Sequence, residues 1–174
     1  MTGYSNYEKF ARLAVVKLEE VLNSDEFRKA VLSGNYIRTN GFSNKDLYEQ
    51  IMKAHEVQGE GGEDKVIDLR LRTLSLDSDG SGWMKACDLN SRYGTIGIDG
   101  NRDGIAAICP QRLELWAKEN SISELAGHYA HEYMHIIGFS HHKCLSSQNW
   151  REKTFVYKIG NLVTELISNN GNAN

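Results

Sequence analysis

Residues 131–141 carry the most informative pattern in the chain and read HEYMHIIGFSH. His131 and His135 are four residues apart, so a helix would bring both imidazoles onto one face, about 6 Å apart along the axis. Gly138 would let the chain leave this helix by a left-handed turn that a side chain would penalise. His141 could then return as a third imidazole and leave a fourth position open on a shared metal ion. The spacing therefore predicts a zinc site made of these three histidines.

Glu132 directly follows the first histidine of this pattern. From that position its carboxylate can reach a water molecule on the metal without becoming a ligand. The arrangement predicts a general base for zinc-assisted hydrolysis. The alternative is a surface helix that is merely rich in histidine, although a helix has no structural need for histidine at this spacing.

The flanking sequence predicts a helix with a clear start and end. Ser121 and Glu124 fit a capping box, with Ser121 as N-cap and Glu124 as the third helical residue. The apolar pattern then continues to Gly138, which predicts a helix over about 122–137.

Composition indicates one globular domain covering residues 1–174. The 174 residues are 40% hydrophobic and 25% charged, which is ordinary for a chain that buries its own core. The net charge of −3 gives no electrostatic reason to expect a nucleic-acid or membrane partner. No apolar run has the length of a membrane span, and the N-terminus lacks a signal-peptide pattern. A monomer, cytoplasmic by default, is the expectation.

The three cysteines are Cys87, Cys109 and Cys144. Three cysteines are too few for a disulfide framework, and an odd number leaves at least one without a partner in the chain. Free thiols are therefore expected. A Cys87–Cys109 bridge stays open as an alternative. Cys144 is expected to be inert, because three histidines already complete the ligand set.

Hydrophobic periodicity elsewhere predicts an α+β fold. Alternation over 67–73 predicts a strand with one solvated face, and 93–98 and 104–109 are expected to form a hairpin. The tail 168–174 is expected to be disordered. Helices are predicted over residues 7–23, 24–33, 43–55, 111–119, 122–137 and 155–167.

Residues 77–88 read DSDGSGWMKACD and match part of a calcium-binding EF-hand loop. Lys85 stands where that loop needs an oxygen ligand, and residues 99–104 repeat only its first half. Tight turns explain both segments as well, since Asp, Asn, Ser and Gly are turn residues. Calcium is therefore kept as a second possible metal. The ligands that the first loop would offer are Asp77, Asp79, Ser81 and Asp88.

The pattern H-E-x-x-H-x-x-G-x-x-H at 131–141 resembles the extended zinc signature of the metzincin metallopeptidases. The resemblance implies a zincin-like fold with N-terminal helices, a small mixed sheet, a long active-site helix and a short C-terminal helical part. It implies His131, His135 and His141 as zinc ligands, Glu132 as general base, and a peptide or protein as substrate. In that clan the substrate lies along an upstream edge strand, which here would belong to the 93–109 hairpin.

The chain also departs from this family. Metzincins place a methionine turn beneath the metal, yet none of the four methionines follows His141. Tyr157 lies in the region that would replace this turn, and some metzincins use a tyrosine there as an extra ligand or oxyanion donor. Its alternative role is to pack the last helix. His142 could replace His141 in a different turn, and His128 is either a neighbour of the site or a satisfied buried histidine.

The sequence thus predicts a minimal or divergent metzincin-like zinc metalloendopeptidase. Two other classes remain open. The first is a zinc-binding recognition protein without catalysis, for which the missing methionine turn is the support. The second is a calcium-binding module that uses the 77–88 loop.

Overall fold

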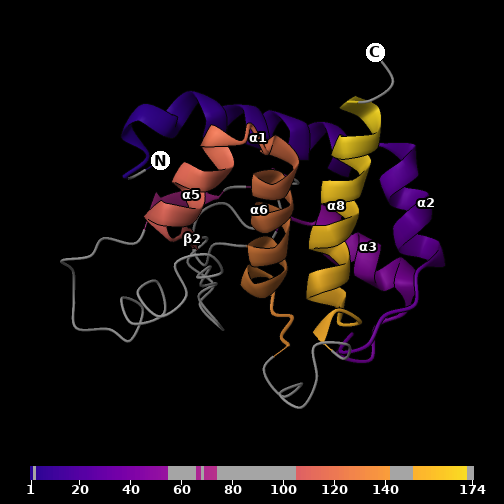
Figure 1. The fold of residues 1–174 in the computed structure, drawn as a ribbon. Coiled ribbons are helices and arrows are strands. Elements are labelled where there is room, and N and C mark those ends of the chain that lie inside the picture. Colours follow the sequence, from indigo (N-terminus) through magenta and orange to yellow (C-terminus); the bar gives the residue numbers. More distant parts are fainter. Residues whose placement is uncertain (2, 55–65, 68, 74–104, 142–150, 172–174) are drawn as a thin grey trace, which may run out of the picture.

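Figure 1 shows the computed structural model of the chain, which describes residues 1, 3–54, 66–67, 69–73, 105–141 and 151–171. Within these ranges the chain forms six α-helices, a short 3-10 helix and a two-stranded sheet. The α+β class is confirmed at this level. The predicted calcium loop at 77–88, the segment 99–104, and strand 93–98 of the predicted hairpin lie outside the described residues, as do His142, Cys87 and Cys144.

The N-terminal part is helical, as its periodicity predicts. Two of its helices begin at serines whose hydroxyls accept backbone N–H groups, an interaction that satisfies the free donors of a first turn. Ser24 accepts from Phe27 N–H at 3.1 Å, and Ser43 forms a reciprocal capping box with Asp46. The elements are η1 (Ser5–Tyr7), α1 (Glu8–Leu22), α2 (Asp25–Ser33) and α3 (Asn44–Met52).

The sheet joins two short strands that are distant in sequence. Strand β1 (Arg70–Thr73) runs parallel to β2 (Ile105–Ile108), with Arg70 opposite Ile105 and Thr73 opposite Ile108. Leu71 of β1 and Ala107 of β2 are buried, so the sheet contributes to the core. The predicted hairpin pairs 104–109 with 93–98, and the parallel pairing of β2 with β1 was not predicted.

Three helices complete the described chain: α5 (Pro110–Lys118), α6 (Ile122–Ile136) and α8 (Phe155–Gly171). Pro110 occupies the start of α5, next to the predicted range 111–119, because its missing N–H has no intrahelical partner there. Helix α8 continues past the predicted end to Gly171, so a disordered tail does not begin at Ser168. Once a helix is formed, each further residue adds a hydrogen bond at small entropic cost.

The predicted capping box at the start of α6 is wrong. Ser121 is the N-cap, but its side chain makes no capping hydrogen bond. Its ψ of 63° differs from the extended ψ of 150° and 162° at the working caps Ser24 and Ser43. A tight turn imposes this conformation: Asn120 is left-handed, and Ser121 N–H donates to Trp116 O at 2.8 Å.

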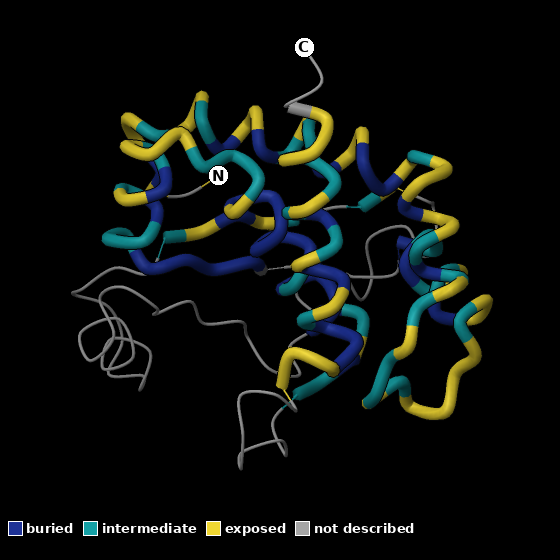
Figure 2. The backbone as a smooth tube through the Cα atoms, turned by 45° about the vertical axis from the view of Figure 1, so that its right-hand side comes forward, coloured by how far each residue is buried: buried dark blue, intermediate teal, exposed yellow. Residues whose placement is uncertain are grey.

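Helix α6 lies at the centre of the molecule. It packs most extensively against α8 and next against α1, which crosses the two in Figure 1. Eleven of its residues are buried, whereas the outer helices alternate between buried and exposed turns (Figure 2). The helix predicted to hold zinc is therefore also the main core helix.

Two observations bear on the cysteine and membrane expectations. Cys109 is fully buried and disulfide-bonded, so the expectation of free thiols is wrong for this residue. An odd cysteine count left this pairing open, because pairing depends on distances that the sequence does not provide. Separately, none of the described helices has the length and apolar character needed to span a bilayer.

Tyrosine hydroxyls tie α6 to the N-terminal part of the chain. Tyr129 donates to the hydroxyl of Tyr4 at 3.0 Å, and Tyr133 donates to Ile51 O at 2.7 Å. Burial raises the pKa of Tyr4 to about 12 and also raises the pKa of Tyr129. Both phenols are therefore neutral in the folded protein at pH values where they ionise in the unfolded chain.

This difference predicts a loss of stability at alkaline pH. From pH 10 to 12 the unfolded chain releases protons that the folded protein retains, so the free energy of unfolding falls by about 1.4 kcal/mol per pH unit for each tyrosine. Urea denaturation at pH 9 to 12 measures this slope. Tyr129→Phe should make the slope shallower; an unchanged slope in this variant would contradict the assignment.

Candidate metal centre

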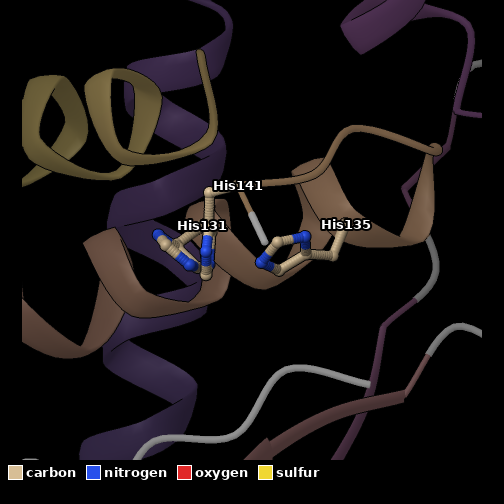
Figure 3. A group of neighbouring side chains, drawn as sticks. All are labelled: His131, His135 and His141. Atoms are coloured by element: carbon tan, nitrogen blue, oxygen red, sulfur yellow. The ribbon is translucent and has the colours of Figure 1, made fainter. Parts of the chain in front are cut away.

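Three imidazoles converge at the C-terminal end of α6. His131 and His135 project from this helix, and His141 comes from the chain that follows it (Figure 3). One nitrogen of each ring lies within 4.8 Å of the other two. Two nitrogens on one zinc ion are at most about 4.2 Å apart, given bonds of about 2.0–2.1 Å. Two nitrogens 4.8 Å apart would therefore have to move closer together by a small rotation of their rings. With that adjustment the three histidines can hold one metal ion.

The turn after α6 returns His141 to the helix. Gly138 has φ of +99°, in the left-handed region predicted for it. Its N–H donates to His135 O and Phe139 N–H donates to Met134 O, both at 2.9 Å. These two bonds form a complete Schellman motif, which satisfies the last carbonyls of the helix. The third histidine is therefore placed by a defined reversal of the chain.

The same turn is held from outside by the loop between α2 and α3. The amide of Asn40 donates to Gly138 O at 3.2 Å, across 98 positions in sequence. The ring of Phe139 packs edge-on against Phe155 at 4.7 Å and against Phe42 at 6.2 Å between centroids. This aromatic contact joins the turn to the start of α8.

The turn also sets the orientation of His135. The Nδ1 atom of this ring lies 2.8 Å from Phe139 O, and a carbonyl only accepts, so Nδ1 carries the hydrogen. The lone pair of the neutral ring is then on Nε2. Metal-binding histidines are commonly held in this way by a carbonyl on the other nitrogen. His135 is thus prepared to bind a metal through Nε2.

Burial and the neighbouring histidines favour the neutral form of the His131 ring. Both effects lower the pKa of His131 well below its usual value, with burial as the larger cause and His135 the next. A metal ion binds the neutral imidazole, so this environment keeps the ligand in its binding form.

Glu132 is almost fully buried, with 2% of its surface exposed. Burial raises the pKa of this carboxyl to about 8. Its Oε1 lies 3.5 Å from Nδ1 of His128, whereas Oε2 has no hydrogen-bond partner among the described residues. A buried carboxylate oxygen without a partner is costly and fits a further group supplied at the site, such as water or a metal ion.

His128 is a buried and hydrogen-bonded histidine, in line with one of its two predicted roles. It is 8% exposed, and its Nε2 lies 3.0 Å from the carbonyl of Ala107 in β2. Burial lowers its pKa to about 4, so the ring is neutral at physiological pH. It links the sheet to α6 directly beside Glu132.

Helix α8 brings Tyr157 to the histidines. Its ring centroid is 4.5 Å from that of His131 and 4.9 Å from that of His141. Two glycines allow the helices to approach: a Cβ on Gly160 would lie 2.9 Å from Gly127 O and 3.1 Å from the Cβ of His131. The ring of Tyr157 therefore packs α8 against His131 and His141.

The structure brings together most of the residues singled out in the sequence. One cluster contains His131, His135, His141 and Tyr157. Glu132 lies on α6, the helix that also carries His131 and His135. The predicted calcium ligands, Cys144 and His142 fall outside the described residues. Sequence analysis missed Asn40 and Gly160. The first has no local signal, whereas a glycine inside a helical pattern, as at Gly160, is a sign of close packing.

No known protein family, curated protein or solved structure significantly matches this chain. The site is therefore interpreted from its own geometry and chemistry.

Replacing Gly160 tests the coupling between α8 and the histidines. Gly160→Ala should lower the free energy of unfolding by about 1–3 kcal/mol, because the new methyl group meets the backbone of α6. The same variant should weaken zinc binding by displacing His131. Asn161→Ala, on the exposed face of α8, is the control for helix propensity. Equal stability and zinc affinity in both variants would contradict the close approach.

The third ligand is tested by zinc titration of histidine variants. Zinc at 100 times its dissociation constant should raise the stability of the native protein by about 2.7 kcal/mol. His141→Ala should lose zinc affinity by more than the roughly 10–100-fold typical for loss of an outer-shell partner, whereas His142→Ala should retain it. Calorimetric titration measures both. The reverse ranking would make His142 the ligand.

Proposed function

We propose that the chain is a zinc-dependent metalloendopeptidase with a metzincin-like site. The observation that carries this proposal is the convergence of three imidazoles at the helix that also holds the buried carboxyl group of Glu132, one oxygen of which has no hydrogen-bond partner among the described residues. Three histidines leave one position of a tetrahedral zinc ion open, which is typical of catalytic rather than structural zinc. The complete motif at 131–141 and its glycine turn support the same class.

The residues have distinct roles in this proposal. His131, His135 and His141 would hold zinc, and the chemistry that zinc would supply is a water of lowered pKa and a polarised carbonyl of the peptide bond. Glu132 accepts a proton from the attacking water and delivers it to the leaving amine. Its raised pKa, about 8 before any metal is bound, suits a group that must both take and release a proton near neutral pH.

Tyr157 is proposed to assist at the same site. Its ring lies against two of the three histidines, which supports a role for its hydroxyl next to a group that they bind. A phenol in that position donates a hydrogen bond to the negative oxygen that develops during attack.

A zincin-like fold is part of the proposal. Its support is the order of elements around the site: a small sheet, a long buried helix, a glycine turn and a C-terminal helix. The described chain has no methionine after His141; at the turn, the ring of Phe139 packs against that of Phe155. The proposed substrate is a peptide or protein.

A zinc-binding recognition protein without catalysis is the second candidate. The near-complete burial of Glu132 favours it, because a general base must reach water. The two candidates differ in turnover and not in metal binding.

Turnover therefore decides between them. The zinc-loaded protein should cleave a mixed peptide library, and Glu132→Ala should keep one zinc per chain while losing at least about 100-fold in kcat/KM. Glu124→Ala removes an exposed glutamate from the same helix and should cleave like the native protein. Mass spectrometry of the digests gives the rates. Cleavage retained in Glu132→Ala would refute the proposed base, and zinc binding without cleavage would favour the recognition protein.

A further inference from the structure

We propose that Asn40 is a positioning residue for the metal centre, because its side chain holds the turn that places His141 and orients the ring of His135. This inference rests on the proposed function, since it assigns a support to two of the proposed zinc ligands. The contact that carries it is the hydrogen bond from the amide nitrogen of Asn40 to Gly138 O at 3.2 Å. The bond joins two residues that are 98 positions apart in the sequence.

Asn40 and α6 hold opposite sides of one peptide group. The carbonyl oxygen of Gly138 accepts from Asn40, and the N–H of Phe139, in the same peptide group, donates to Met134 O at 2.9 Å. Because a peptide group is planar, a bond on each side restricts its rotation. The next carbonyl along the chain, Phe139 O, receives the Nδ1 hydrogen of His135 at 2.8 Å. The restricted peptide group therefore directs the carbonyl that orients the His135 ring.

The loop that carries Asn40, residues 37–42, is anchored at both ends. At its start, Ile37 forms two backbone hydrogen bonds with the segment that begins α8, at 2.9 and 3.1 Å. At its end, the ring of Phe42 packs edge-on against that of Phe139, with 6.2 Å between centroids. The amide of Asn40 is thus presented to the turn by a loop that is fixed on either side of it.

The backbone of Asn40 gives a second possible reason for an asparagine at this position. Its φ is +54°, in the left-handed region, and Gly41 follows with φ of +85°. Asparagine enters this region more readily than most residues. A purely structural role would need only this backbone conformation, which glycine also adopts. The proposed role needs the amide hydrogen as well.

Two substitutions separate these roles, because both glycine and aspartate accept the left-handed backbone. Asn40→Gly keeps the conformation of the loop and removes the side chain. Asn40→Asp keeps the shape of the side chain, but an ionised carboxylate has no hydrogen to donate to a carbonyl.

Both variants should bind zinc about 2–10-fold more weakly, the effect expected for loss of one hydrogen bond. Calorimetric titration measures this change. With cobalt in place of zinc, both variants should also shift the visible absorption bands, because these depend on the geometry of the metal ligands.

Asn44→Ala is the matched control. The amide of Asn44 also donates to backbone carbonyls, those of Leu32 and Gly34, but at the end of α2 and not at the turn. This variant should melt at a lower temperature and keep the native zinc affinity and cobalt spectrum. Native zinc affinity in both Asn40 variants, or an equal loss in Asn44→Ala, would overturn the proposal.

A measurement without metal keeps the test independent of the proposed function. In the zinc-free protein, the amide hydrogens of Gly138 and Phe139 should exchange about 2–10-fold faster in both Asn40 variants, since they form the bonds of the supported turn. The amide of Phe27, bonded at the cap of α2, should exchange at the native rate. Unchanged exchange at the turn would overturn the contact. If the native protein binds no zinc, the proposed function is wrong, whereas exchange still decides whether Asn40 holds the turn.

Discussion

The reversal of the chain at Gly138 is the constraint on which the site depends. Its left-handed conformation ends α6, and its two hydrogen bonds satisfy the last carbonyls of the helix. The same turn places Phe139 O against Nδ1 of His135 and returns His141 to the helix face. One local conformation thus sets the position of His141 and the orientation of the His135 ring. A side chain at this position would strain all of these contacts at once.

The site lies on the main core helix, α6. His128, Glu132 and His135 are buried polar groups on α6, and buried polar groups are costly without partners. Backbone carbonyls of Ala107 and Phe139 satisfy two of them, whereas one oxygen of Glu132 remains unpaired among the described residues. A metal ion or water bound at this oxygen would supply the missing interaction and would therefore stabilise the folded chain.

Local features of the sequence were enough to predict much of this arrangement. The helices predicted from residues 24 and 43 begin at serine caps, and α6 ends at the predicted glycine turn. Each of these features acts within a few residues, so its pattern is visible in the sequence. The spacing of the three histidines on a helix and its turn is equally local.

Contacts between distant segments could not be predicted in this way. The parallel pairing of β1 with β2 and the bond from Asn40 to Gly138 depend on tertiary packing that no short pattern encodes. The capping hydrogen bond predicted for Ser121 is absent for a related reason, because the preceding turn fixes the Ser121 backbone in a conformation that does not support it.

The most direct test of a zinc site at the three histidines is anomalous diffraction at the zinc absorption edge from crystals grown with zinc. The account predicts one strong peak between the rings of His131, His135 and His141; a peak elsewhere, or none at this position, would contradict it.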